Sequence, residues 1–330
     1  MKTAIVITVK NEERLLKQNL RYHFALGINK AFVYFDGTTD NGPKSIQTLN
    51  KVEFQNSVKP EKYSSLDFLK KFTTQAEEHH TARQCLNTYD AMLKCKNEEI
   101  DWLISIDADE LFYPGENINL KDFFRSASSF DIITLKPLEV INRKIAYKDV
   151  FKEETLFKTQ KNFKSKFDQI NFKLQNPYTK EALQTSYWLG HTMGKSIINI
   201  NSEVIPHNVH RFKLIKGKAK TVNKGFVLHY HMFDFEDFIK KFQNFKNHPP
   251  VFLSGNKIGD LKSFFIKLVN DEDRTEESLK QYYVKNLLFD DSKLKQLKKT
   301  RFFNLLKRKE KAVLKIETPK KLLSNNSSTF

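Results

Sequence analysis

Three carboxylates stand within four residues in the stretch Asp107-Ala108-Asp109-Glu110. They follow an apolar run at residues 102–106, which predicts a buried strand. Carboxylates this close repel one another, so burial requires a charge that offsets theirs. Because open α/β sheets bind ligands at the carboxyl ends of their strands, and because Mg²⁺ and Mn²⁺ accept oxygen ligands, the stretch predicts a metal site that holds substrate phosphates. The alternative interpretation is a solvated acidic turn.

The elements that must position this cluster alternate between strand and helix. Strands are expected at residues 3–9, 30–35, 52–54 and 101–107, and helices after residue 11, after Pro43 and at residues 77–95. Asn11 can cap the first helix and Gly27 can end it. This alternation predicts a parallel sheet with right-handed crossovers. Residues 56–75 are polar and poorly patterned, so we expect an exposed excursion there.

The second half of the chain is less regular. Residues 139–190 carry many Lys, Phe and Asn residues without clear periodicity. Further strands are expected at residues 196–200 and 226–230, and helices from residue 233 and at 278–289 and 294–314. Ser324 to Phe330 should form a disordered polar tail.

Composition narrows the class of protein. A chain of 330 residues with 39% hydrophobic residues is long enough and apolar enough for a large globular core. The net charge of +17 favours an anionic partner, although charge alone does not indicate nucleic acid, which we do not expect as a partner. Cys85 and Cys95 cannot build a disulfide framework, and no segment has the length of a membrane span. Neither a dinucleotide fingerprint nor a P-loop is present, which removes two common kinds of nucleotide-binding protein.

Five motifs in order resemble GT-A-fold glycosyltransferases, and most closely a branch of the family 2-like enzymes. They are Val9-Lys10-Asn11-Glu12-Glu13, residues 26–40, residues 101–110, Gly194-Lys195-Ser196-Ile197-Ile198 and Leu228-His229-Tyr230-His231. The resemblance spans about residues 3–245. It implies an α/β fold with a mixed, mostly parallel, Rossmann-like sheet flanked by helices. The implied domains are a catalytic domain at 1–235, with a nucleotide-binding half at about 1–115 and an acceptor half at about 116–235, and a helical C-terminal extension at 236–330.

The resemblance also implies a set of metal ligands. Asp109 would hold Mn²⁺ or Mg²⁺ against the donor diphosphate, and Asp107 would contact the ribose or the metal through water. A late histidine often completes such sites, and His229 matches that motif, with His231 as the nearby substitute. Both side chains are expected on one face because the two residues alternate along a strand.

The same resemblance implies donor-binding residues. Asp36 would accept a hydrogen bond from the uracil ring, and Arg83 would face the nucleotide. Asn11 and Glu12 would close the first strand beside that pocket, and Lys195 would contact phosphate or the acceptor. Each has a simpler alternative. Asp36 could only form a turn and Arg83 could be a solvated residue on a helix. Asn11 or Glu12 could only cap a helix, and Lys195 could be a surface lysine.

The implied reaction is transfer of a sugar from a nucleotide-sugar donor, expected to be a UDP-sugar, to a hydroxyl of a glycan or lipid-linked glycan such as a lipopolysaccharide or capsule precursor. We expect inversion at the anomeric carbon, which requires a general base, and retention stays open. The base is not identified from the sequence. Asp168, Glu203 and His210 are candidates by position only.

Residues 293–321 are rich in Lys and Arg, and an apolar stripe of Leu294, Leu297, Phe302, Leu305 and Ile316 falls near one side of a helix. This pattern predicts a basic amphipathic helix that docks on an anionic membrane surface. We expect a cytoplasmic protein, and membrane docking would place it on the inner face of the plasma membrane. A solvated helix packed on the catalytic domain is the alternative.

Two other classes of protein compete with a glycosyltransferase. A sugar-phosphate nucleotidyltransferase requires a glycine-rich loop after the first strand, and Lys10-Asn11-Glu12-Glu13-Arg14 contains no glycine. A non-enzymatic module that binds nucleic acid or membrane leaves the carboxylates at residues 107–110 unexplained, because carboxylates repel phosphate unless a metal intervenes.

Overall fold

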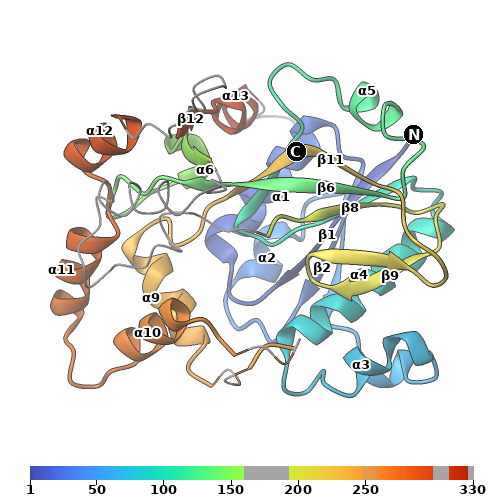
Figure 1. Cartoon of the computed structure of the whole chain (residues 1–330), viewed down its shortest axis with the longest axis horizontal. Coiled ribbons are helices and arrows are strands. Elements are labelled where there is room, and N and C mark those ends of the chain that lie inside the picture. Colours follow the sequence, from blue (N-terminus) through green and yellow to red (C-terminus); the bar gives the residue numbers. More distant parts are fainter. Residues whose placement is uncertain are drawn as a thin grey trace, which may run out of the picture.

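The computed structural model describes residues 1–159, 193–247, 249, 251–253, 255, 257–299 and 312–325. Within these residues the fold is built on a ten-stranded mixed sheet (Figure 1). Eight strands follow one another in space in the order β12 (Val313–Lys315), β7 (Leu156–Thr159), β6 (Ile132–Val140), β8 (Ser196–Asn199), β4 (Trp102–Ser105), β1 (Thr3–Val9), β2 (Lys30–Phe35) and β3 (Val52–Asn56). Off this path, β11 (Thr221–His229) pairs with β6 and with β5 (Glu110–Tyr113).

The N-terminal half of the sheet is parallel. Strands β1, β2, β3 and β4 run in one direction, so their carboxyl ends meet at one edge. Strand β1 is buried on both faces, because Ile5 and Ile7 pack against α1 (Glu13–Leu26) and Ala4 and Val6 pack against α4 (His80–Asn97). Two short helices, α2 (Gly42–Ile46) and α5 (Leu120–Arg125), add to the α1 side. The predicted α/β architecture with helices on both faces is confirmed.

The other half of the sheet contains antiparallel pairs. Strand β8 runs antiparallel to both β4 and β6, so Ser196 at its start lies opposite Ser105 at the end of β4. Strand β11 runs parallel to β6 and antiparallel to β5. A separate antiparallel pair is formed by β9 (Val204–Asn208) and β10 (Arg211–Leu214). These pairings bring late segments of the chain to the edge where the early strands end.

The prediction of an exposed excursion at residues 56–75 is correct only in part, because residues such as Glu61 and Lys71 are exposed while four apolar side chains are buried. The segment forms short turns of helix, η1 (Pro60–Tyr63), η2 (Asp67–Leu69) and α3 (Lys70–Thr73). Val58, Tyr63, Leu69 and Phe72 are buried against the α4 side of the sheet. Their spacing fits neither a helix nor a strand because several tight turns carry them, so no periodicity indicated burial.

Between β11 and residue 299 the described chain forms the helices α9 (Phe235–Asn244), α10 (Asp260–Val269), α11 (Glu276–Asn286) and α12 (Asp291–Lys299). Figure 1 shows them together at one end of the sheet, on the left. They share a core that includes Phe238, Phe242 and Tyr283. The expected helical extension is therefore present, while the domain boundary at residue 235 stays a prediction.

The prediction of one basic amphipathic helix within residues 293–321 is wrong for the part that the structure describes. Residues 313–315 form β12, an edge strand paired with β7. Leu294, Leu297 and Ile316 are buried in the protein core, so these side chains are not available to a lipid surface. Phe302 and Leu305 lie outside the described residues.

The expected disordered tail also needs correction. Ser324 belongs to α13 (Thr318–Asn325), which packs against α1 and α6 (Val150–Glu153) through residues such as Leu323. Residues 326–330 of that tail lie outside the described residues. Among the helices that the structure describes, none is both long and apolar enough to cross a bilayer.

Candidate active site

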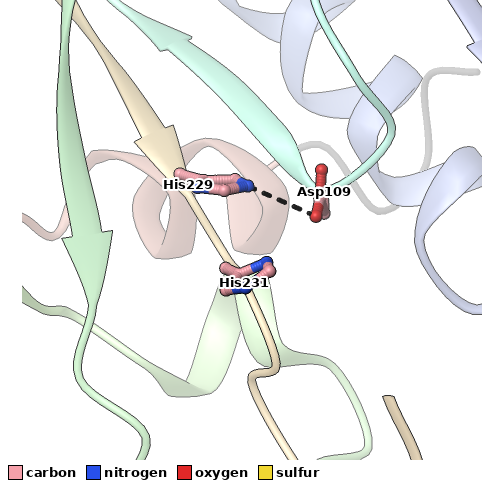
Figure 2. Close-up of side chains that lie close together, drawn as sticks. All are labelled: Asp109, His229 and His231. Atoms are coloured by element: carbon pink, nitrogen blue, oxygen red, sulfur yellow. Dashed lines mark ion pairs between the residues drawn. The ribbon is translucent and has the colours of Figure 1, made fainter. Parts of the chain in front are cut away.

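Asp109, His229 and His231 come together at the carboxyl edge of the sheet. Asp109 lies in the turn between β4 and β5, and His229 ends β11. One ligand atom from each of the three side chains lies within 4.8 Å of the other two, and Figure 2 shows both rings projecting toward the carboxylate. The imidazole rings are stacked with centroids 5.2 Å apart, and the Tyr230 N–H donates to the Asp109 carbonyl oxygen at 2.8 Å. Backbone bonding therefore holds the two segments in contact.

The Asp109 carboxylate has cationic partners in this structure. Its Oδ2 lies 2.7 Å from Lys241 Nζ on α9 and 3.4 Å from His229 Nε2. Burial raises the pKa of Asp109, but the charges of Lys241 and His229 outweigh burial and hold this pKa well below its usual range. Burial lowers the pKa of His229, and its carboxylate neighbours Glu139 and Asp109 outweigh that effect and raise it.

The donor set of one carboxylate and two imidazoles suits a divalent transition metal. Mn²⁺ accepts both oxygen and imidazole nitrogen, whereas Mg²⁺ favours oxygen ligands alone. Opposite ligands of a metal with bonds of about 2.1 Å lie about 4.2 Å apart. The 4.8 Å spread of the three ligand atoms therefore requires only a small adjustment of the side chains. The residues present fit a metal of the Mn²⁺ type, provided that Lys241 yields its place at Asp109 and that His229 releases the proton on Nε2.

Asp107 lies beside this cluster and is not part of it. Its Oδ1 accepts from Gln84 Nε2 at 2.6 Å and its Oδ2 from Lys195 Nζ at 2.7 Å. Glu110 Oε2 accepts the Asp107 N–H at 2.9 Å. Both carboxylate oxygens of Asp107 thus have protein partners. The sequence predicted Asp107, Asp109 and one histidine as metal ligands, whereas the group found among the described residues contains Asp109 and both histidines.

Lys195 is a buried counter-ion of the acidic stretch. Its side chain is 1% exposed and its Nζ also lies 3.5 Å from Glu110 Oε2. The preceding Gly194 lies so close to β6 that a Cβ there would stand 1.8 Å from the Leu135 carbonyl oxygen, so only glycine fits. This approach fixes the path of the chain before Lys195. The structure therefore gives Lys195 carboxylate partners where the sequence predicted a phosphate or acceptor contact.

Asp36 and Arg83 meet at the end of β2. Arg83 Nε donates to Asp36 Oδ1 at 2.6 Å and Arg83 Nη2 donates to Oδ2 at 2.9 Å, a bidentate pair. Ser57 Oγ also donates to Asp36 Oδ1, at 2.9 Å, and Ser57 borders a cavity of about 600 Å³. Arg83 thus orients Asp36, where the sequence predicted direct contact between Arg83 and a nucleotide.

Asn11 and Glu12 follow β1, and Asn11 does not cap α1 as predicted. Asn11 has φ of 57°, and its Oδ1 accepts from the Thr39 N–H at 2.8 Å, which joins the loops after β1 and β2. Glu12 occupies the cap position without a side-chain cap bond. Its Oε2 accepts from Lys240 Nζ at 2.8 Å, and burial, only partly offset by Lys240, raises the pKa of Glu12 to about 7. Both residues therefore connect elements at this edge of the sheet.

Of the three candidate bases, the structure brings His210 to the acidic stretch. His210 lies between β9 and β10, where its Nδ1 is 3.2 Å from the Gly194 carbonyl oxygen and its ring is within electrostatic range of Asp107. Glu203 is exposed and lies after β8, at the edge opposite the acidic stretch. Asp168 lies outside the described residues.

The sequence did not indicate several residues that contact the predicted ones, among them Lys241, Gln84 and Glu139. Glu139 Oε1 lies 2.9 Å from His229 Nδ1. The sequence could have indicated such residues by a charged or polar side chain in an otherwise apolar stretch, as with Lys241 close to Phe238 and Phe242 on α9. That signal identifies unusual residues without naming their partners, because partners depend on strand register.

The carboxyl edge of this sheet carries an acidic turn with two imidazoles, and a second carboxylate, Asp36, is buried at the end of β2. This arrangement has the plan of a GT-A-fold glycosyltransferase. The chain belongs to glycosyltransferase family 92, whose family model matches residues 8–254. Membership places the chain among glycosyltransferases, in preference to the nucleotidyltransferase and non-enzymatic alternatives.

Curated and solved proteins give more distant likenesses. A glycosyltransferase-like protein of Arabidopsis thaliana is 23% identical over 231 residues, which is 66% of this chain and 50% of that protein, so the chain spans about half the length of the curated relative. S. aureus TarS residues 1–349 align at 12% identity and a TM-score of 0.34, covering 85% of this chain and 78% of TarS. HddC from Yersinia pseudotuberculosis aligns at 12% identity and a TM-score of 0.34, covering 74% of this chain and 100% of HddC.

Proposed function

We propose that this chain transfers a sugar from a UDP-sugar to an acceptor hydroxyl with the help of a divalent metal, preferably Mn²⁺. The observation that carries the proposal is the cluster of Asp109, His229 and His231 at the carboxyl edge of the sheet. The Asp36–Arg83 pair stands at the end of β2, which is parallel to β4 and separated from it by β1. One edge thus offers a metal site and a carboxylate for a nucleobase, the two features that a nucleotide-sugar donor requires.

Each residue has a task in donor binding under this proposal. Asp36 accepts a hydrogen bond from the uracil N3–H, since its carboxylate oxygens have lone pairs beyond those used by Arg83 and Ser57. Asp107, held by Gln84 and Lys195, faces the ribose. Asp109, His229 and His231 hold the metal. A metal bound there supplies positive charge that neutralises the diphosphate.

The proposed displacement is inverting. The acceptor oxygen forms a bond to the anomeric carbon while the bond from that carbon to the diphosphate oxygen breaks, and the acceptor proton passes to a base. His210 is the proposed base. Burial and then Lys195 lower the pKa of His210 to about 4, so its ring is unprotonated at neutral pH and able to accept a proton. As acceptor we propose a glycan or lipid-linked glycan, and the net charge of +17 favours one with anionic groups.

The test compares UDP binding by the wild-type protein and by Asp109→Asn in Mn²⁺. Asn keeps an oxygen for Lys241 but removes the charge that a metal requires, so UDP affinity should fall by more than about tenfold. Asp122→Asn is the matched control, because Asp122 is an exposed carboxylate paired only with Arg125 among the described residues. Wild-type UDP affinity in Asp109→Asn would remove the metal from the proposal.

A further inference from the structure

Four buried ionisable residues form a row across four neighbouring strands. His229 on β11 has Glu110 as its register partner on β5 and Glu139 on β6, and Glu139 has Lys158 as its partner on β7. Register partners lie side by side on the same face of a sheet. All four are nearly inaccessible, with exposed fractions of 4% for Glu110, 9% for His229, 5% for Glu139 and 3% for Lys158. The row is therefore buried, and one of its members, His229, also belongs to the metal cluster.

Glu139 has no place in the metal cluster itself, which contains Asp109, His229 and His231. A buried carboxylate costs free energy unless it has charged or hydrogen-bonding partners. Glu139 has the His229 ring on one side, with Oε1 2.9 Å from Nδ1, and Lys158 as register partner on the other. The partners that stabilise Glu139 thus connect it directly to a proposed metal ligand.

The hydrogen bond fixes which ring nitrogen faces the metal cluster. A carboxylate only accepts hydrogen bonds, so His229 Nδ1 carries the proton that Glu139 receives. The other nitrogen, Nε2, then points toward Asp109, whose Oδ2 lies 3.4 Å away. Histidine ligands of metals commonly donate their second N–H to a carboxylate, which fixes the ring and increases its basicity.

We propose that Glu139 is a positioning residue that holds His229 with Nε2 directed at the metal, with Lys158 balancing the charge of Glu139. This role rests on the proposed metal site. It makes metal affinity depend on Glu139, which lies outside the cluster. Glu139 acts through His229 only, so its effect should vanish when His229 is removed and persist when His231 is removed.

The experiment measures Mn²⁺ affinity from the electron paramagnetic resonance signal of free Mn²⁺, at one fixed UDP concentration, in the full-length protein. Glu139→Gln keeps the shape and removes the charge, and should weaken Mn²⁺ binding by about 10- to 100-fold. Glu154→Gln is the matched control, because Glu154 is 1% exposed and bonds Arg143 and Tyr147 instead of a cluster residue. It should lower thermal stability without changing Mn²⁺ affinity.

Two double variants make the result specific. Glu139→Gln should add nothing to His229→Ala but should further weaken His231→Ala. Should Glu139→Gln not fold, Glu139→Asp, which withdraws the carboxylate by one methylene, should still bind Mn²⁺ more weakly than the wild type. Wild-type affinity in the Glu139 variants alongside loss in His229→Ala would overturn the role of Glu139 alone. Absence of Mn²⁺ binding in the wild type would overturn the metal site together with this inference.

Discussion

At the scale of single residues, the proposed metal site contains its own competing cation. Lys241 Nζ is 2.7 Å from Asp109 Oδ2, the same oxygen that faces His229. Under the proposed function, a metal that binds this oxygen would displace the ammonium, and a donor diphosphate would offer the ammonium a new anionic partner. We therefore expect metal and nucleotide to favour one another's binding, because each removes a charge conflict that opposes the other.

The ligand types predict which metal is preferred. Two imidazole nitrogens beside one carboxylate oxygen suit Mn²⁺ better than Mg²⁺, so UDP binding should be at least about tenfold tighter in Mn²⁺. His231→Ala removes one imidazole and should reduce that preference. Calorimetric titration of UDP in each metal measures both effects. Equal affinity in Mg²⁺ and Mn²⁺ would exclude the histidines as ligands.

At the scale of elements, helix α1 is fastened to β5 by a buried histidine. His23 is fully buried, its Nδ1 lies 2.8 Å from the Asn19 carbonyl oxygen, and its Nε2 accepts from the Phe112 N–H at 3.1 Å. Accepting at Nε2 requires a neutral ring. Burial, only partly offset by the Asn19 carbonyl, lowers the pKa of His23 from 6.5 to about 4.

This histidine predicts a loss of stability in mild acid. Between pH 6.5 and about 4 the unfolded chain binds a proton at His23 that the folded chain does not, so the free energy of unfolding falls as pH falls. The expected slope from this residue is about 1.4 kcal/mol per pH unit. Urea unfolding at pH 7, 6 and 5 measures it. His23→Gln cannot titrate and should show a shallower dependence, whereas parallel curves for both proteins would contradict the assignment.

Elements with strong local patterns were predictable. The β-branched run at Thr3–Val9 and the apolar run at Lys30–Phe35 gave the strands that the structure shows, because a buried parallel strand needs apolar residues on both faces. Residues 56–75 and Val313–Lys315 were not predictable in this way. The first segment buries side chains through short turns, and the second is an edge strand stabilised by pairing with β7.

At the scale of the whole molecule, the C-terminal segments pack into the sheet and contact the candidate site, so they are not a separate appendage. Strand β12 extends the central sheet, and α12 contributes Leu294 and Leu297 to the core shared by α9, α10 and α11. Helix α9 in turn carries Lys240 and Lys241 to Glu12 and Asp109. The sequence indicated Asp109, His229 and His231 through their motifs, whereas the contacts of α9 join residues up to 228 positions apart and depend on tertiary packing.

Burial of the α12 apolar residues gives a test of this arrangement. Leu297 is 3% exposed, so Leu297→Ala should lower the free energy of unfolding by about 3 kcal/mol through lost burial and a cavity. Urea unfolding measures the change, and cosedimentation with anionic vesicles should be the same for both proteins. Unchanged stability together with weaker vesicle binding would restore the membrane-surface interpretation of this segment.

The central claim is a metal-dependent site for a uridine nucleotide, and calorimetric titration of UDP into the purified protein tests it most directly. We expect UDP to bind in Mn²⁺ and to lose this binding in EDTA, because Asp109, His229 and His231 are proposed to hold the metal at the edge where the donor diphosphate would lie. Equal UDP binding in Mn²⁺ and in EDTA, or no binding in either, would contradict it.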